Sequence, residues 1–385
     1  MLLNVYNRFN VNFVKGKGVY LYDDQGNEFL DFVSGIAVNC LGHAHPVISE
    51  ALRKQGETLI HISNLYHSEA QTKLVDKLIG LSKHENVFFS NSGTEANELA
   101  IKIARKYGNN INNNKTEIIY MKDSFHGRST GSLAVTGQKK YQEPFEPLIP
   151  NVTECLFNNI EDFISKINEN TCAVILEPVQ GESGIQTASP EFLKVLKEKC
   201  EEYNALLIFD EIQCGMGRMG TLFAYDKLGV VPDIVTIAKA LGGGVPIGAC
   251  LTRGKANDVM VPGDHGSTYG GNPLVCAVAY DVLTELVDNK VIAGVEEKGK
   301  YVSEKLNALK EKYDLIEEIR GTGLLIGIKL NERVAAREFA NKAFDNKFLL
   351  VPAGNNVLRY FPPLNVTFEE IDKSIIKIEE VLKEI

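Results

Sequence analysis

The sequence has no surplus of basic residues. Its 385 residues include 41 Lys and Arg against 50 Asp and Glu, a formal net charge of −9. Nucleic acids and anionic membrane surfaces attract proteins through basic faces, so this balance argues against both kinds of partner. A few local arginines are enough to bind a small anion. We therefore expect small-molecule partners, no nucleic acid and no membrane.

The chain also lacks a membrane-spanning run and any paired cysteine spacing. No segment approaches the roughly 20 apolar residues of a span, and the start, MLLNVYNRFNVNF, has no continuous apolar stretch. The seven cysteines are scattered singly, without a C-x-x-C pair. Four histidines between positions 43 and 67 lack the spacing of a zinc site, so no metal is expected. These absences favour a cytoplasmic protein.

From about residue 87, short apolar runs alternate with helical patterns. This alternation is typical of βα units around a buried, mostly parallel sheet. The expected strands cover 87–90, 117–121, 173–178, 205–211 and 233–239. After Asn272-Pro273 a long helical region leads into shorter strand and helix patterns, which indicates a second, smaller α/β domain.

Two helices carry recognisable end signals. Ser92 and Glu95 match a capping box, and Gly108 stands where that helix is expected to end. Ser189-Pro190 opens a second helix with a cap and a proline at its first position. The Asn-rich segment 108–116 is expected to be a solvated loop.

Polar or glycine-rich groups follow the five expected strands. Ligands of an open parallel sheet bind outside the carboxyl ends of its strands. Any one group could be an ordinary surface loop, but together they predict a single crevice. The groups are 90–95, 123–128, 177–184, 210–213 and 239–244.

Asp210 and Lys239 each end an apolar strand, where an ionised side chain needs a partner. Two interpretations stay open. The two residues could form a structural ion pair with each other. Alternatively, Asp210 faces the protonated ring nitrogen of an electron-sink cofactor and Lys239 forms a Schiff base with its aldehyde. The glycines at 242–244 would allow close backbone approach beside the lysine.

Other candidates each have an ordinary alternative. The amides of Gly93 and Thr94 would open a helix, where an anion such as phosphate is favoured, although a simple capped turn fits equally well. Arg128 offers a planar fork for a carboxylate or is a surface charge. Arg359 lies in an apolar strand pattern and needs an anion, and Glu182 could supply it, permanently or only without substrate.

The segment 215–220, GMGRMG, is a formal G-x-G-x-x-G. A nicotinamide-dependent oxidoreductase would need a helix opening at these glycines and an acidic residue about 20 positions later at the end of a second strand. Asp233 comes 13 residues after Gly220 and begins a strand. The match is therefore interpreted as incidental, with 215–220 turning the backbone around the crevice.

Taken together, NSGTEAN, SFHGR, EPVQGESG, LLIFDEIQCGMGR, DIVTIAKALGGG and HGSTYGGNP, in this order, resemble the class III pyridoxal-phosphate aminotransferases. The resemblance covers nearly the whole chain. It implies an α/β fold of PLP-dependent fold type I, in which a mostly parallel seven-stranded sheet forms a large domain beside a smaller α/β domain. The implied boundaries are 1–48 for an N-terminal segment joining the small domain, 49–273 for the large domain and 274–385 for the small domain.

The resemblance also implies the cofactor, pyridoxal 5'-phosphate, and its contacts. Lys239 would bind it covalently and move the proton at the substrate carbon, Asp210 would hold the ring nitrogen protonated, and Phe125 would stack on the ring. The phosphate would also meet Thr268 of a second subunit, which implies a homodimer with the site at its interface. The implied cofactor-binding residues are Gly93, Thr94, Phe125, Asp210, Glu211, Ile212, Gln213, Lys239 and Thr268.

Within the class, SGIAVNCLGHAHP, HISNLYH and YGGNPLVCAVA are most similar to the acetylornithine aminotransferases. This similarity implies transfer of the δ-amino group of N2-acetylornithine to 2-oxoglutarate in arginine biosynthesis. Arg128 and Ser267 would contact the acylated substrate, Arg359 the α-carboxylate of glutamate, and Glu182 would neutralise Arg359 in the other half-reaction. Ornithine, 4-aminobutyrate and succinylated diamines stay open as substrates.

Two positions depart from the family pattern. Ser183 stands where the family usually has glycine after QGE, and Met219 stands where GMGR is commonly followed by Thr. A Cβ at 183 would restrict the backbone next to Glu182 if φ is positive there.

Overall fold

The structure, a computed structural model, describes residues 2–385. Its centre is a seven-stranded sheet with the order β4-β12-β11-β10-β7-β5-β6. All neighbours from β11 to β6 pair in parallel, and only β12 runs antiparallel to both of its neighbours. The expected mostly parallel sheet is confirmed. The strands are β4 (Asn86–Ser90), β5 (Glu117–Met121), β6 (Val152–Cys155), β7 (Thr171–Leu176), β10 (Leu206–Asp210), β11 (Ile234–Ile237) and β12 (Gly248–Thr252).

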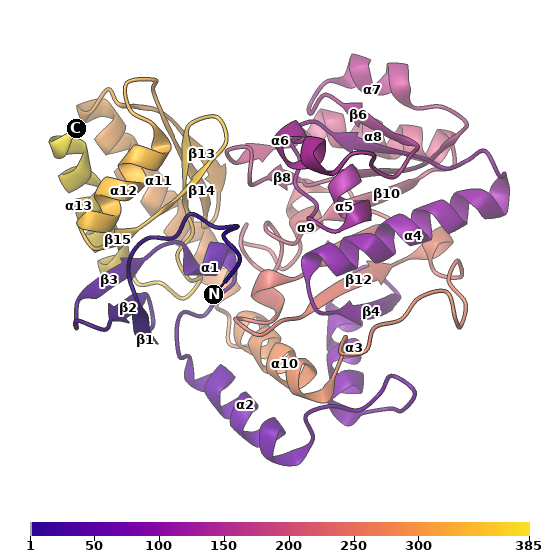
Figure 1. Ribbon diagram of the computed structural model, residues 1–385, viewed down its shortest axis with the longest axis horizontal. Helices are drawn as coiled ribbons and strands as arrows, with labels where there is room; N and C mark the ends of the chain where they lie inside the picture. Colours follow the sequence, from indigo (N-terminus) through magenta and orange to yellow (C-terminus); the bar gives the residue numbers. More distant parts are fainter. Residues whose placement is uncertain (1) are drawn as a thin grey trace.

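Alternating side chains of this sheet enter two separate cores. Ile208 and Ile234 pack on one face with the apolar stripe of α4 (Gly93–Ile111). Phe209 and Val235 pack on the other face with α8 (Pro190–Glu202). Because successive strand residues point to opposite faces, the all-apolar runs are those of a sheet covered on both sides. Figure 1 shows α4 running along the front of the sheet.

A second group of elements lies beside the large sheet, at the left of Figure 1. An antiparallel sheet of order β13-β14-β17-β16 packs against α11 and α12, α13 packs on these two helices, and β15 pairs in parallel with β3 of the N-terminal segment. Helices α2 (Pro46–Thr58), α3 (Glu69–Leu81) and α10 (Pro273–Val287) lie apart from this group, at the bottom of Figure 1, where α10 packs against the other two. The elements of the second group are β1 (Phe13–Lys17), β2 (Tyr20–Asp23), β3 (Glu28–Asp31), α11 (Val295–Lys312), β13 (Ile316–Thr322), β14 (Leu325–Leu330), α12 (Ala336–Asp345), β15 (Phe348–Leu349), β16 (Val351–Ala353), β17 (Val357–Tyr360) and α13 (Phe368–Glu384).

Short elements connect the two groups and line the edges of the sheets. None of the helices within 2–385 is both long and apolar enough to cross a membrane. The short elements are α1 (Ser34–Ala37), α5 (Thr130–Ala134), α6 (Lys139–Gln142), β8 (Val179–Gln180), β9 (Gln186–Thr187), α9 (Ala224–Leu228) and 3-10 turns at Glu143–Phe145, Lys239–Leu241, Gly254–Ala256 and Ile292–Gly294.

The end of α4 corrects the sequence interpretation. Its expected cap is present, since the Ser92 side chain accepts from the backbone N–H of Glu95, but the helix continues past Gly108 to Ile111. Gly108 is buried against the next strand connection, where a Cβ would overlap the carbonyl oxygen of Lys115. The glycine therefore serves close packing rather than a helix end, and part of the Asn-rich segment is helical.

Because of this packing, replacement by alanine should change the stability in opposite directions at two helical glycines, Gly108 and Gly80. Gly108→Ala should destabilise the protein by about 1–3 kcal/mol, because the extra methyl overpacks a filled site. Gly80→Ala is the matched control: Gly80 is exposed in α3 with nothing near its Cβ position, so the change should stabilise by about 0.5–1 kcal/mol. Thermal unfolding of both variants measures the effect. Equal midpoints would contradict the close approach at Gly108.

Candidate active site

One cavity of about 440 Å³ opens at the carboxyl ends of the sheet strands. The structure brings all five polar groups singled out from the sequence to it. Its lining residues include Asn91, Gly93, Thr94, Phe125, His126, Arg128, Glu177, Glu182, Asp210, Ile212, Gln213 and Lys239. They include three acidic residues, the N-terminus of α4 and one arginine, Arg128.

Asp210 is held by residues that the sequence did not single out. Its Oδ2 accepts a hydrogen bond of 2.7 Å from Asn97 Nδ2 and lies 2.8 Å from Nδ1 of His126, while its Oδ1 accepts from the backbone N–H of Ile212 at 3.0 Å. The side chains of His126 and Asp210 are 0% and 3% exposed. Asp210 makes no ion pair with Lys239 among the described residues. The structural ion pair considered above is therefore wrong, and the free side of the carboxyl group faces the cavity.

Lys239 follows β11 in a strained backbone conformation. Its φ of 44° is left-handed, which is uncommon for a residue with a Cβ and often marks a functional position. Burial lowers the pKa of Lys239, and the positive charge of Arg359 lowers it further. A neutral amine, the form that acts as a nucleophile or base, is thus favoured at this position.

The N-terminus of α4 borders the same cavity. Gly93 is the first helical residue, and its backbone approaches Ile212 so closely that a Cβ would lie 2.6 Å from Ile212 Cδ1. The Thr94 hydroxyl lies 2.7 Å from the Ser132 hydroxyl, and a Cβ on Gly127 would overlap it. Free N–H groups and the helix dipole at this end favour an anion.

Glu177 is a second buried carboxyl group that the sequence did not single out. Its Oε1 accepts from the Phe125 backbone N–H at 2.8 Å and its Oε2 from that of Gly181 at 3.2 Å. Burial, together with the negative charge of Asp210, raises its pKa to about 8. Glu177 thus ties the loop that carries Phe125 to the loop that carries Glu182.

Two arginines near the cavity differ in state: Arg128 lines it, whereas Arg359 does not and is bonded to Glu182, which does. Arg359 on β17 is 2% exposed, and its Nη1 donates to Oε1 of Glu182 at 2.7 Å. Although burial alone raises the pKa of Glu182, the Arg359 charge brings it below its usual value. Arg128 is exposed and makes no hydrogen bond or ion pair within residues 2–385; its guanidinium lies 3.7 Å from the ring centroid of Tyr141. One arginine is therefore neutralised and the other is free.

The backbone restriction that a positive φ would impose at Ser183 does not arise. Ser183 has no positive φ, and the left-handed positions of this loop are Gly184 (φ 98°) and Ile185 (φ 56°). The Ser183 hydroxyl donates to Oε1 of Gln180 at 3.0 Å. The serine therefore adds a bond to the loop of Glu182 without straining it.

Glu211, which the resemblance implies among the cofactor-binding residues, does not line the cavity. Its carboxyl group accepts the backbone N–H groups of Ala224 and Tyr225 at 2.6 and 2.8 Å, at the start of α9. Neighbouring residues of an extended segment point to opposite sides, so Asp210 and Glu211 cannot share the cavity. Ile212 and Gln213 do reach it, and Gln213 Oε1 is buried without a hydrogen-bond partner within 2–385.

Ser267 and Thr268 do not line the cavity of their own chain. The Ser267 hydroxyl accepts from Gly270 N–H at 2.9 Å and from Asn91 Nδ2 at 3.3 Å, so it touches one lining residue. Thr268 is exposed.

Arg218 does more than turn the backbone. It is buried, and its Nη1 donates to the carbonyl oxygens of Leu324 and Pro362 at 3.3 and 2.5 Å. Its own carbonyl accepts from Leu324 N–H at 3.0 Å. The glycine-rich segment therefore anchors β10 to the part of the chain that carries Arg359.

Known proteins resemble this chain over nearly its whole length. The model of the aminotransferase class-III family matches residues 3–382. An acetylornithine aminotransferase of Clostridium acetobutylicum is 56% identical over 384 residues, which are 99% of each chain. Among solved structures, an ornithine aminotransferase of Toxoplasma gondii has a TM-score of 0.95 at 33% identity and covers 99% of this chain and 92% of its own. The N-acetylornithine aminotransferase of Stenotrophomonas maltophilia has a TM-score of 0.87 at 36% identity, with 98% and 97% covered.

The raised pKa of Glu177 predicts a pH dependence of stability. A folded-state pKa of about 8 lies above the ordinary value of the unfolded chain, so this contribution is present at low pH and is lost as the pH rises through 8. Glu177→Gln removes the titration. The variant should therefore lose less stability than the wild type between about pH 5 and pH 8.5, by on the order of 1 kcal/mol or more.

Thermal unfolding at both pH values checks this, with Glu191→Gln on the exposed side of α8 as the control. A pH slope in the Glu177 variant equal to that of the wild type would show that Glu177 does not take up a proton on folding.

Proposed function

The chain belongs to the class III aminotransferases, enzymes that depend on pyridoxal phosphate, and we propose that it transfers the δ-amino group of N2-acetylornithine to 2-oxoglutarate. The products are N-acetylglutamate 5-semialdehyde and glutamate, a step of arginine biosynthesis. The observation that carries the substrate assignment is that Arg128 is free at the cavity while Arg359 is neutralised by Glu182.

The cavity residues fit the cofactor. The buried Gln213 Oε1 lacks a partner within 2–385, and the glycine at 93 lets the start of α4 pack closely on Ile212, which lines the cavity. Asp210 supplies a carboxyl group for a ring nitrogen, and Lys239 supplies an amine for an aldehyde. The N-terminus of α4 supplies N–H donors for a phosphate. We infer that these residues, with Phe125 against the ring, hold pyridoxal phosphate.

When bound, the cofactor supplies a carbon that carries the amino group and a ring that delocalises the electron pair released at the substrate carbon. Asn97 and His126 hydrogen-bond to Oδ2 of Asp210 and hold its carboxyl group at the cavity, where it would face the ring nitrogen. Lys239 takes the proton from the substrate carbon and returns it, a task that its lowered pKa favours.

Two arginines distinguish the two substrates by their carboxylates. N2-acetylornithine has one carboxylate, at the end away from its δ-amine, and Arg128 is free to bind it. Glutamate has a carboxylate at each end, so the second must reach Arg359. The Glu182 bond neutralises Arg359 while the amine of acetylornithine occupies that side, and it opens when the α-carboxylate of glutamate arrives. A fixed cation there would repel the amine.

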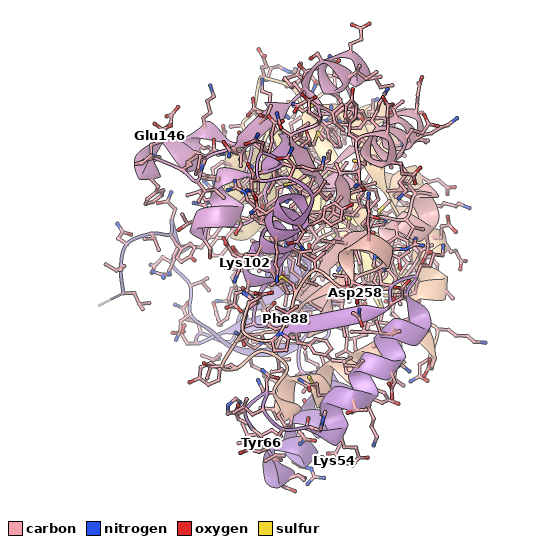
Figure 2. All side chains as sticks on the ribbon, turned by 90° about the vertical axis from the view of Figure 1, so that its right-hand side faces the viewer. Lys54, Tyr66, Phe88, Lys102, Glu146 and Asp258 are labelled. Carbon is pink, nitrogen blue, oxygen red and sulfur yellow. The ribbon has the colours of Figure 1, made fainter. Side chains whose placement is uncertain are left out.

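A second copy of the chain would complete the site. Apolar side chains gather on the exposed segment 59–66 and beside Thr268, with Leu65 and Tyr66 84% and 68% exposed and Tyr269 64% exposed. Asn64 donates to the carbonyl oxygens of Ser267 and Gly270, which joins these segments into one surface. Tyr66, labelled in Figure 2, lies at the end of the molecule that carries α2 and α3. We propose a homodimer in which Thr268 reaches the partner's phosphate site.

The cysteines fit a reducing compartment. All seven are free and buried. We propose that the enzyme works in the cytoplasm.

Turnover on a panel of amino donors tests the substrate assignment. With 2-oxoglutarate as acceptor, kcat/KM should be at least about tenfold higher for N2-acetylornithine than for ornithine, 4-aminobutyrate or N-succinyl-diaminopimelate. The physical reason is that ornithine places a free ammonium beside Arg128, and 4-aminobutyrate has a shorter chain. A preference for ornithine would assign the chain to the other activity found among its structural relatives.

A further inference from the structure

A stack of side chains at the cavity wall holds Arg128. The Arg128 guanidinium carbon lies 3.7 Å from the ring centroid of Tyr141 and 5.7 Å from that of Phe125. The two rings stand nearly perpendicular, 82° apart with centroids separated by 6.1 Å. Since Arg128 makes no hydrogen bond or ion pair within the described chain, the face of Tyr141 is the contact that orients its guanidinium.

Tyr141 is itself fixed by its own short helix. It lies on α6, next to Gln142, whose Nε2 donates to the carbonyl oxygens of Leu133 and Ala134 at 3.2 Å each. Those two carbonyls belong to α5, which begins two residues after Arg128. The hydrogen bonds between α6 and α5 therefore fix the position of the Tyr141 backbone relative to that of Arg128.

Stacking leaves the binding edge of the guanidinium free. The N–H donors of arginine lie in the plane of the group, and two of them match the two oxygens of a carboxylate. A ring on the face of the group fixes this plane without using any donor. A salt bridge in the same position would fix the plane as well, but it would occupy the donors that the substrate needs.

We propose that Tyr141 is a positioning residue: its ring sets the plane of Arg128 and so gives the cavity its preference for substrates that end in a carboxylate. This inference rests on the proposed function, because it assigns Arg128 to the carboxylate distant from the reacting amine. Tyr141 does not touch the reacting atoms and acts only through Arg128.

Steady-state kinetics of the holoenzyme with variants at position 141 tests the proposal. Tyr141→Phe keeps the ring and should stay within about twofold of the wild type. Tyr141→Leu removes the aromatic face and should lower kcat/KM for N2-acetylornithine about three- to tenfold, mostly through KM, because the carboxylate meets a guanidinium that is no longer oriented. Tyr141→Gln is a second variant, in case the leucine disturbs folding.

A double-mutant cycle separates positioning from a general structural role. In an Arg128→Gln background, Tyr141→Leu should cause almost no further loss, since the group that it positions is absent. Losses that multiply would overturn the proposal, as would a Tyr141→Leu enzyme with wild-type kcat/KM or a Tyr141→Phe enzyme as impaired as the leucine variant.

L-Glutamate as amino donor keeps this test separate from the substrate assignment, because its distal carboxylate also reaches Arg128. If the wild type does not use N2-acetylornithine, the proposed function fails, and the same cycle measured with glutamate still decides the role of Tyr141.

Discussion

The ion pair of Arg359 and Glu182 is the interaction on which the account of this site depends. A guanidinium that is 2% exposed cannot stay without a counter-charge, and Glu182 at 2.7 Å supplies it. The pair joins β17 to the turn between β8 and β9, and the two residues lie 177 positions apart in the chain. Whatever competes for Arg359 must itself be an anion. The pair therefore makes the cavity's charge depend on which substrate enters.

Buried negative groups at the end of the sheet need partners for the same reason. Asp210, Glu177 and Glu211 are all buried carboxyl groups near the end of the sheet, and each is satisfied differently. Asp210 is bonded by the side chains of Asn97 and His126 and by the backbone N–H of Ile212, whereas Glu177 and Glu211 each accept two backbone N–H groups. Asp210 and Glu177 line the cavity, and Glu211 does not. Arg218 adds a mechanical link, since it bonds the segment after Asp210 to the chain segment around Arg359.

The sequence predicted the sheet well and the side-chain network poorly, for physical reasons. Apolar runs and caps are local signals, so the five strands and the start of α4 were found within a few residues. Gly108 was misread because its role depends on a contact with Lys115 across a turn. His126 and Glu177 lay inside motifs already quoted, but their importance comes from partners 84 and 52 residues away. Tyr141 lies in none of the quoted motifs, and its role is suggested only by the contact of its ring with Arg128.

Single-turnover kinetics of Glu182→Gln measures most directly whether Glu182 governs access to Arg359. The neutral amide no longer competes for the guanidinium, so the enzyme should bind L-glutamate about tenfold more tightly, while its half-reaction with N2-acetylornithine slows because an unpaired cation now faces the incoming amine. Opposite effects on the two half-reactions are the predicted result. Glutamate binding that is unchanged or weaker, or equal losses in both half-reactions, would contradict the account.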